Sequence, residues 1–425
     1  MSTRNTASFA FREEDLQTIK NKMLNWLRPF SIFSYLDNNR YQHGPNRFEM
    51  IAGAGQVQSS RSIDTHGEDW LFGHISYDYK NQVEEQLNSR YADFIGFEDI
   101  AFFQPQTVVY IRYKTCELQV HTLESDADTV LQVILSAASV VSNDQEAIAA
   151  TPAWQYRFDE DSYCSAVQQI RSHIEDGDCY EMNFCTEAFA TRQQIDPVFT
   201  FHQLNVLNPS PFAGLYRNDA AWLICASPER FLHKQEDTLL SQPIKGTSRR
   251  SADAAEDERL KTALYNNPKE RAENVMIVDL VRNDLARSCL PGSVQVPELF
   301  GVYTLPQVHQ LISTVTGRMQ PGLPLQTAID NAFPMGSMTG APKFIVMELT
   351  EVYEHSRRGL YAGSIGYVTP EGDFDFNVVI RSLLYNQGSG YLSYQTGGAI
   401  TYDSDPQAEW AEVRLKARAM EQVFL

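Results

Sequence analysis

Two stretches of the chain repeat apolar residues at the spacing of an amphipathic helix. In the first, over 130–141, one stripe is formed by Val130, Leu131, Ile134, Leu135, Ala138 and Val141. In the second, over 161–175, one face is formed by Cys164, Val167, Ile170 and Ile174, and Gly177 follows where a helix commonly ends. The pattern predicts two helices, separated by a stretch of polar and small residues over 142–152.

Short runs rich in β-branched and aromatic residues predict strands on both sides of that polar stretch. These runs are 70–78, 107–113, 363–368 and 376–382. Helices and strands do not alternate in repeating βα units, so the pattern favours an α+β fold with antiparallel sheets. The polar stretch is the best candidate boundary, and it divides an N-terminal part, 1–150, from a C-terminal part, 151–425.

The composition narrows the class of protein. The 425 residues include 35 Lys and Arg against 54 Asp and Glu, a formal net charge of −19, and 43% are hydrophobic. This apolar content excludes global disorder, and the acidic balance argues against nucleic acid or an anionic membrane as a partner. No apolar run approaches the roughly 18 residues of a membrane span. Because the N-terminus lacks the apolar core of a secretory signal and the six cysteines form no CxxC pair, we expect a cytoplasmic protein with reduced thiols.

Two segments begin with a residue pair that typically opens a helix, Asn267-Pro268 and Asp405-Pro406. Each predicted helix then carries two glutamates that are three residues apart and therefore share a face. These glutamates are Glu270 and Glu273 in the first segment and Glu409 and Glu412 in the second. Four carboxylates on two helices can bind Mg²⁺, which prefers oxygen ligands.

The same glutamates also allow a simpler interpretation. Glu412 can pair with Lys416 four residues on, and Glu273 can pair with Lys269. Charged pairs of this kind usually lie on a solvated helix face, so spacing alone leaves both interpretations open.

A lysine and a glutamate lie in surroundings that favour reactivity. Lys245 stands between an apolar residue and a Gly-Thr turn, where desolvation or a nearby cation would lower its pKa and free the amine as a nucleophile. Glu229 lies in the string ASPERF, where an apolar environment would keep its carboxyl protonated as a general acid. The alternatives are an ordinary lysine at a strand end and a surface ion pair between Glu229 and Arg230.

The string NAFPMGSMTGAPKF (331–344) is rich in small residues and contains Ser337. Small residues permit close approach of the backbone, and the N–H groups of the helix that Pro342 opens suit an anionic or hydroxylated ligand. The alternative is a tight turn chosen for packing. A comparable pair, Gly397 and Gly398, precedes the second glutamate helix.

Three polar residues lie in or beside predicted strands. Tyr367 and Arg381 have apolar neighbours, and Arg381 is a candidate to bind a carboxylate with its planar guanidinium. His309 begins the predicted strand HQLISTVTG, and most single histidines in such a position are structural.

Taken together, the ordered strings resemble the chorismate-utilising enzyme family. They are SPERF, PIKGTSRR, ENVMIVDLVRNDLAR, HQLISTVTG, FPMGSMTGAPK, GSIGY, VVIRS and GGAITYDSDPQAEWAEVRLKARA. The resemblance is dense from about residue 161 to the C-terminus and weaker in FSYLDNN (33–39) and FGHISYD (72–78). It implies two large, mostly antiparallel β-sheets packed together, with helices outside and with the N- and C-terminal parts intertwined.

The resemblance also implies roles for the candidate residues. Glu273 and Glu412 would bind Mg²⁺ directly and Glu270 and Glu409 would support them through water, while the ion holds the ring carboxylate of chorismate. The other residues expected to contact the substrate are Gly397, Gly398, Ala399, Tyr367, Arg381, Ser337, Lys416 and His309. Tyr367 and Arg381 would receive the enolpyruvyl carboxylate, and His309 would lie near the ring.

The lysine in PIKGT is typical of family members of the aminodeoxychorismate synthase type, which aminate chorismate. The implied mechanism is attack of Lys245 on ring C2 while Glu229 protonates the leaving C4 hydroxyl, followed by entry of ammonia at C4. Ammonia would come from a separate glutaminase subunit. Anthranilate synthase component I and a catalytically silent glutaminase-binding subunit are the alternatives.

One position departs from the family pattern. The segment CYEMNF (179–184) carries Glu181 where the family usually has glutamine and where water-using members have lysine. The absence of that lysine argues against water as the nucleophile.

Overall fold

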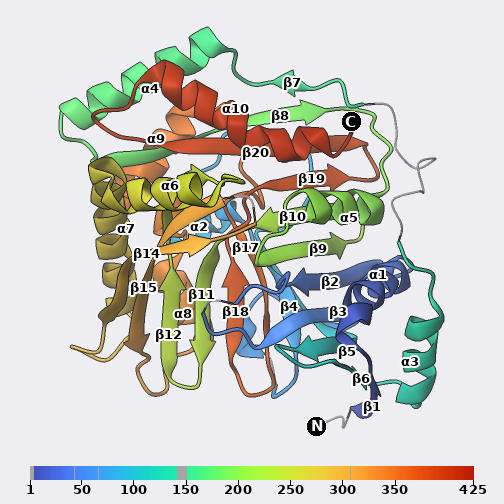
Figure 1. The fold of residues 1–425 in the computed structure, drawn as a ribbon. Helices are drawn as coiled ribbons and strands as arrows, with labels where there is room; N and C mark the ends of the chain where they lie inside the picture. The colour runs from blue at the N-terminus through green and yellow to red at the C-terminus, as the bar shows by residue number, and fades with distance from the viewer. Residues whose placement is uncertain (1–3, 43, 66, 141–150, 307) are drawn as a thin grey trace.

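Antiparallel strands form the framework of the molecule, and helices lie outside them (Figure 1). The computed structural model describes residues 4–425 except for 43, 66, 141–150 and 307. The first sheet runs, in spatial order, through β7 (Gln155–Tyr156), β8 (Glu181–Ala190), β20 (Tyr391–Ile400), β19 (Ser382–Asn386), β10 (Ala221–Ser227), β9 (Phe212–Asn218), β2 (Ile32–Asp37) and β3 (Phe48–Ser60). The short β16 (Gly340–Ala341) also pairs with β8.

Strand β5 (Ile100–Arg112) joins this sheet to a second one, because it pairs with both β3 and β4. The second sheet runs through β4 (Leu71–Ile75), β17 (Ser364–Val368), β18 (Phe374–Asn377), β11 (Arg230–Gln235), β12 (Thr238–Gln242) and β15 (Val308–Arg318), which also pairs with β13 (Ile244–Arg249) and β14 (Gln295–Thr304). Beyond β5 lie β6 (Glu117–Thr122) and β1 (Asn5–Ala10). The α+β architecture that the sequence predicts is confirmed, and strand pairing continues through β5.

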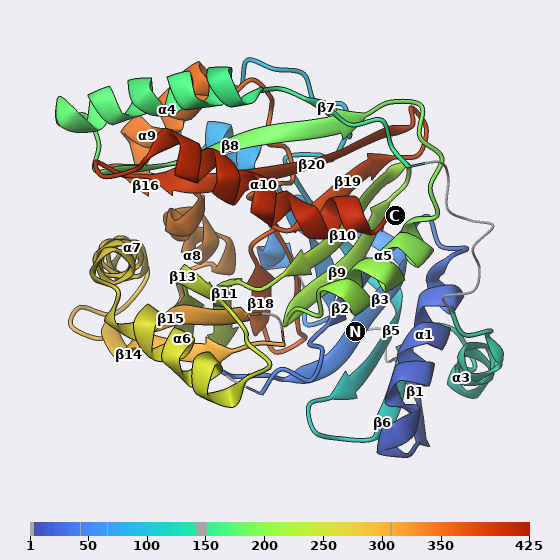
Figure 2. The same ribbon diagram turned by 45° about the horizontal axis from the view of Figure 1, so that its top comes forward.

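Most helices lie on the outer faces of the sheets (Figure 2), whereas α8 contributes Ala328 and Ile329 to the core between them. They are α1 (Leu16–Leu27), α2 (Lys80–Val83), α3 (Ala127–Ser136), α4 (Glu160–Glu175), α5 (Pro197–Leu207), α6 (Ala254–Asn266), α7 (Pro268–Ala286), α8 (Leu325–Ala332), α9 (Lys343–Tyr353) and α10 (Pro406–Gln422). Helix α10 packs on β20, α4 and α9 pack on β8, and α6 and α7 pack on β13 and β15. The two glutamate helices therefore begin near different sheets.

Side-chain alternation along the strands builds separate cores on the two faces of the first sheet. In β10, Leu223 and Cys225 point into the core between the sheets, while Trp222 and Ile224 point into the core beneath the helices. All four side chains are buried. Strands that are apolar on both faces therefore lie between two layers, which explains why β10 reads as a continuous apolar run.

Each sheet contains strands from both the N-terminal and the C-terminal part, and the two parts meet at one strand pairing in each sheet. Strand β2 pairs with β9, and β4 pairs with β17. The predicted boundary stretch falls mostly on 141–150, outside the described residues, so the division at residue 150 stays a prediction.

Most predicted elements have counterparts, with two corrections. The first predicted helix ends at Ser136 rather than at 141, although Val130, Leu131 and Ile134 are buried as the stripe requires. The predicted strand over 376–382 is broken at 378–381 between β18 and β19. Arg381 there has a φ of +53°, a left-handed conformation that interrupts a strand.

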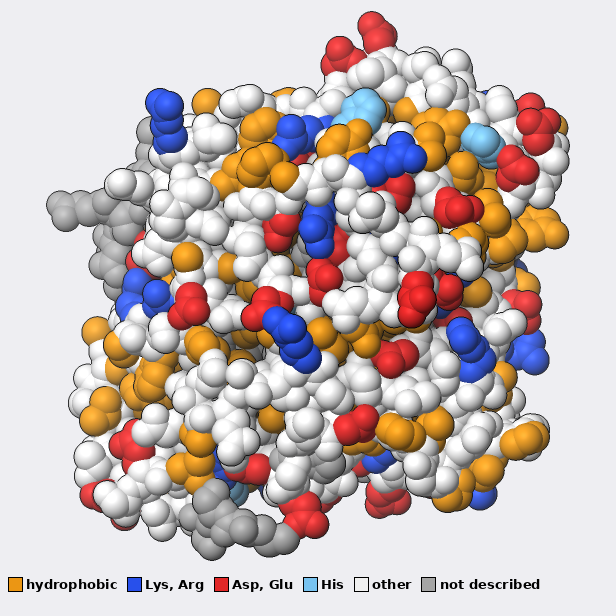
Figure 3. All heavy atoms as spheres, turned by 180° about the vertical axis from the view of Figure 1, so that it is seen from behind, with side chains coloured by type: hydrophobic (Ala, Val, Ile, Leu, Met, Phe, Trp, Pro, Cys, Tyr) orange, Lys and Arg blue, Asp and Glu red, His pale blue; other side chains and the backbone are white. Residues whose placement is uncertain are grey.

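Charges of both signs are interspersed over the face of the molecule opposite to the view in Figure 1 (Figure 3). Within the described ranges, no helix is long and apolar enough to cross a membrane. The six cysteines are free thiols, and all but Cys116 are buried.

Candidate active site

The amine of Lys245 lies in a buried cluster of carboxylates. Lys245 is on β13 of the second sheet, and its Nζ donates a hydrogen bond of 2.6 Å to Oε1 of Glu181, the first residue of β8 in the first sheet. Both side chains are buried, with exposed fractions of 8% and 1%. Burial opposes the charged amine, but the carboxylates of Glu181, Glu273 and Glu229 outweigh it and raise the pKa of Lys245. The prediction of a lowered lysine pKa is therefore wrong for this geometry, because a carboxylate from another strand contacts the amine.

Glu229 is the second candidate for catalysis, and its carboxyl is buried in the link between β10 and β11. Burial raises the pKa of Glu229 to about 7, although a hydrogen bond with Ser337 and the charge of Lys245 act in the opposite direction. The alternative ion pair with Arg230 does not form, because that guanidinium bonds to Asp375 at 2.9 Å. Near neutral pH Glu229 can therefore both donate and accept a proton.

The string of small residues forms a turn fastened to β8. Ser337 lies in a short 3₁₀ turn, Gly336–Met338, and its carbonyl accepts a 3.0 Å hydrogen bond from Asn183 of β8. A Cβ on Gly340 would lie 2.0 Å from the carbonyl oxygen of Glu181, so this approach requires glycine. The turn therefore keeps Ser337 close to β8 and Glu181. The side chain of Ser337 also forms a hydrogen bond with Glu229.

The four glutamates of the two helices are brought together around lysines. The Nζ of Lys269 lies 3.7 Å from Oε1 of Glu273 on α7 and 3.9 Å from Oε1 of Glu409 on α10. One ammonium thus contacts both helices. The Nζ of Lys416 lies 2.7 Å from Oε1 of Glu412, so both ion pairs of the simpler interpretation are present.

Two glycines allow the carboxylates to approach the sheets closely. A Cβ on Gly246, next to Lys245, would lie 2.8 Å from Oε2 of Glu270. A Cβ on Gly398 of β20 would lie 3.0 Å from Oε2 of Glu409. Both contacts place a carboxylate against the backbone beside the buried lysine or on β20.

The pKa is raised for three of the four glutamates, whereas that of Glu412 is lowered, because the effect of burial is outweighed by nearby cations, chiefly Lys416. Burial raises the pKa of Glu270 and of Glu409, and the charge of Glu412 adds to both shifts. Burial, with the carboxylates of Glu181 and Glu270, raises the pKa of Glu273 to about 7. Among the described residues, no group of three or more His, Cys, Asp or Glu side chains is arranged to hold a metal ion. The donor set nevertheless fits Mg²⁺ chemically, because it consists of oxygens whose mutual repulsion a divalent cation would relieve.

The glycines of β20 meet β8 and α10. A Cβ on Gly397 would lie 2.5 Å from Sγ of Cys185 on β8, and the Gly397 carbonyl accepts a 2.7 Å hydrogen bond from Nζ of Lys416. Ala399 lies opposite Asn183 in the ladder. These predicted residues therefore lie at the same end of the β8–β20 pair as Glu181.

Arg381 lies close to Glu412 near this end of the strands, whereas Tyr367, its expected partner, lies elsewhere. Burial lowers the pKa of Arg381, whereas Tyr361 and Glu412 are close enough to oppose that shift. Tyr361 is buried, and its hydroxyl lies 3.7 Å from Sγ of Cys185. The sequence analysis missed this tyrosine, which precedes β17 by three residues.

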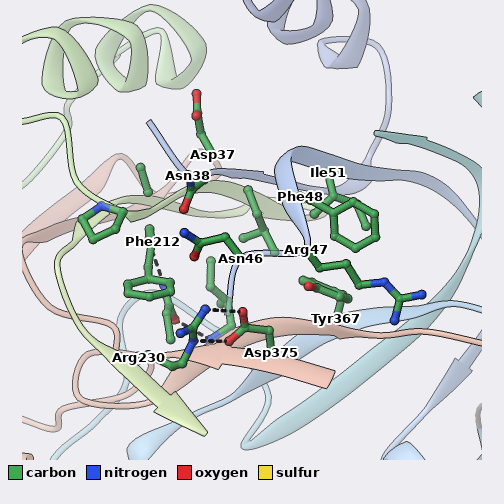
Figure 4. Close-up of a pocket in the computed structure, with 15 residues that line it drawn as sticks. Asp37, Asn38, Asn46, Arg47, Phe48, Ile51, Phe212, Arg230, Tyr367 and Asp375 are labelled. Atoms are coloured by element: carbon green, nitrogen blue, oxygen red, sulfur yellow. Dashed lines mark hydrogen bonds and ion pairs between the residues drawn. The ribbon is translucent and has the colours of Figure 1, made fainter. Parts of the chain in front are cut away.

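Tyr367 lies in a different pocket, so its predicted grouping with Arg381 is wrong. Figure 4 shows it beside Arg47 and Phe48, in a pocket that Arg230 and Asp375 also line. Its ring centroid is 5.5 Å from that of Phe48. The pocket lies between N-terminal strands and β17, away from the glutamate helices.

His309 makes structural contacts instead of presenting a free ring nitrogen to a substrate. It is on β15, where Nε2 lies 3.1 Å from Oδ1 of Asp257 and Nδ1 lies 3.0 Å from Oγ1 of Thr304. Both ring nitrogens are therefore occupied, as the structural interpretation of a single histidine expects.

A buried ion pair that the sequence analysis missed bonds to the backbone of two segments of the site. Arg358 donates to both carboxylate oxygens of Glu354, at 2.6 and 2.9 Å, and also to the carbonyls of Met338 and Asn183. Both charged residues are almost fully buried. The pair connects the turn that carries Ser337 to strand β8.

Comparisons with known proteins identify the family and the fold of this chain. The chain is 42% identical over 262 residues to aminodeoxychorismate synthase component 1 of Klebsiella aerogenes, covering 62% of this chain and 57% of that protein. It is 33% identical over 366 residues to aminodeoxychorismate synthase component 1 of Bacillus subtilis, covering 83% of this chain and 76% of that protein. The fold matches the crystal structure of anthranilate synthase component I from Streptococcus pneumoniae with a TM-score of 0.74, at 24% identity, over 99% of this chain and 93% of that one. A family model described as chorismate binding enzyme matches residues 21–422, and the chain belongs to this family.

Proposed function

We propose that this protein aminates chorismate at C4 with ammonia, giving 4-amino-4-deoxychorismate on the route to p-aminobenzoate and folate. The observation that carries the proposal is the buried cluster of Lys245 and Glu229 beside the two glutamate helices. The names of the relatives in Klebsiella and Bacillus support it. Because the match spans little more than half of the Klebsiella protein, the activity of the whole protein is part of the proposal.

Lys245 and Glu229 perform the bond changes in this proposal. The neutral amine of Lys245 attacks ring C2, the two ring double bonds shift, and the C4 hydroxyl leaves as water with a proton from Glu229. Ammonia then attacks C4, the double bonds shift back, and the bond from C2 to Lys245 breaks. Glu229 accepts the surplus proton of the new amine. A pKa of about 7 suits Glu229 to both transfers.

Substrate carboxylates would be bound at two ends of the site. We propose Mg²⁺ for the ring carboxylate, held by Glu273 and Glu412 and supported by Glu270 and Glu409; the ion supplies a positive charge that orients this carboxylate. Ser337, Lys416 and the backbone at 397–399 lie at the same end. Arg381 would hold the enolpyruvyl carboxylate, with Tyr361 taking the place first expected of Tyr367.

We also propose a glutaminase subunit as the source of ammonia, which the designation component 1 in the relatives supports. The proposal does not depend on that subunit, since an ammonium salt can replace it in the test.

The test is incubation of the purified chain with chorismate, Mg²⁺ and an ammonium salt, followed by mass spectrometry. The expected product has the ring hydroxyl replaced by an amine and keeps its pyruvyl group. Anthranilate as product would assign the chain to the alternative synthase. Absence of turnover, even with a glutaminase subunit and glutamine, would favour a silent subunit. A Lys245→Ala variant should lose turnover, and full activity of that variant would exclude the covalent role.

A further inference from the structure

The contact between Glu181 and Lys245 places a carboxylate within hydrogen-bond distance of the charged amine. Nζ and Oε1 are 2.6 Å apart, and both groups are excluded from water. The second oxygen of Glu181, Oε2, is buried and has no hydrogen-bond partner among the described residues. A buried carboxylate oxygen without a hydrogen-bond partner is unfavourable for folding, so its presence points to a role in binding or catalysis.

We propose that Glu181 is the proton acceptor for Lys245, taking the ammonium proton before the amine attacks and returning it when the lysine leaves. This inference rests on the proposed function and deepens it. Glutamine, the usual family residue in this segment, can accept a hydrogen bond from the amine but cannot take its proton.

The charged groups facing Lys245 come from three parts of the fold, and each has a separate role in the proposal. Glu181 faces it from β8 and Glu229 from the link between β10 and β11, while Glu273 and Glu270, a proposed metal ligand and its support, lie on the first turns of α7. Among the described residues, only the Glu181 carboxylate forms an ion pair with Nζ. Glu229 must carry a proton for the leaving hydroxyl, and Glu273 is a proposed metal ligand. Glu181 is the carboxylate that remains to accept the lysine proton.

The proton transfer balances through the whole cycle. The resting pair is the ammonium of Lys245 with the carboxylate of Glu181, and transfer gives a neutral amine and a carboxylic acid. The amine lone pair forms the bond to C2, which leaves a positively charged secondary amine in the adduct. When ammonia enters at C4, the C2–N bond breaks and both electrons return to Nζ. The neutral lysine then regains its proton from Glu181.

A purely electrostatic role for Glu181 predicts the opposite effect of removing its charge. If the carboxylate only holds Lys245 in its charged form, then Glu181→Gln should lower the lysine pKa, free the amine and speed its attack. If the carboxylate accepts the proton, the same substitution should slow the attack even though the amine is less basic. The direction of the rate change therefore separates the two roles.

The experiment measures the first chemical step by itself. Chorismate and Mg²⁺ are mixed with the protein without ammonia, and intact-protein mass spectrometry follows the adduct on Lys245, whose added mass is that of chorismate minus water. Peptide analysis places the adduct on the lysine. We expect adduct formation in Glu181→Gln to be slower by about 10²-fold or more at neutral pH, within the usual range for general base catalysis. Glu181→Asp, which keeps a carboxylate, should recover part of this rate.

Glu187→Gln is the matched control, because Glu187 is a buried glutamate on the same strand that pairs with Arg157. It should form the adduct at the parental rate, and unfolding midpoints of all variants verify their folding. Adduct formation in Glu181→Gln at or above the parental rate would overturn the inference while leaving the proposed function intact. Failure of the parent chain to aminate chorismate would instead overturn the proposed function.

Discussion

Replacing Glu229 by glutamine tests whether burial holds this carboxyl protonated near neutral pH. The pKa rises from 4.5 to about 7, chiefly because the side chain is buried. A raised carboxyl pKa makes the folded state bind the proton more tightly than the unfolded state. Its favourable contribution to the free energy of unfolding is therefore fully present below about pH 4.5 and is lost as the pH rises through about 7. The shift of about 2.5 units corresponds to roughly 3 kcal/mol.

The neutral amide of Glu229→Gln does not titrate, so the variant shows no such loss as the pH rises. Relative to the parent, the variant should therefore gain about 2 to 3 kcal/mol in free energy of unfolding between about pH 5 and pH 8. Urea titrations of both proteins at the two pH values measure this quantity, and other carboxyls such as Glu273 cancel in the comparison. An equal stability difference at both pH values would refute the reasoning, because it would show that Glu229 titrates normally in the folded protein.

Three further substitutions test the rest of the site. Gly398→Ala adds a Cβ 3.0 Å from Oε2 of Glu409. The variant should need a several-fold higher Mg²⁺ concentration for half-maximal turnover. An unchanged Mg²⁺ dependence would contradict the proposed metal site. Arg358→Met leaves the buried carboxylate of Glu354 without its charged partner. The free energy of unfolding, measured by urea titration, should fall by about 3–5 kcal/mol. A loss below about 1 kcal/mol would show that the ion pair is dispensable. Arg381→Lys should raise the KM for chorismate at least about tenfold, because an ammonium cannot bind a carboxylate in the bidentate manner of a guanidinium; an unchanged KM would remove Arg381 from the substrate site.

Local signals in the sequence correctly predicted where the two glutamate helices, α7 and α10, begin. Asn267 accepts hydrogen bonds from the N–H groups of Lys269 and Glu270, and Asp405 accepts one from Ala408. These caps involve residues two or three positions apart, so the sequence contains all the information they need. The shared face of each glutamate pair follows from the helical period for the same reason.

Local signals in the sequence could not show which tyrosine lies near Arg381. Tyr361 and Tyr367 lie six residues apart on either side of the start of β17, and both are buried tyrosines in apolar surroundings. The choice depends on the strand break at 378–381, where backbone bonds join Ala362 to Val379 and bring the two segments together. A left-handed φ at an arginine has no sequence signal, whereas at a glycine it would have had one.

The protonation state of Lys245 shows why reactivity is harder to predict than burial. Its apolar neighbour and the following turn correctly indicate a desolvated side chain, and desolvation by itself lowers a lysine pKa. The residue that reverses the sign, Glu181, is 64 positions away and belongs to the other sheet. A buried lysine with a carboxylate partner rests in its charged form, so it becomes a nucleophile only if the partner takes the proton. The fold therefore places the proposed acceptor and the proposed nucleophile on strands of different sheets. If the proposal holds, a change in how β8 and β13 approach each other should alter the rate of attack before it alters substrate binding.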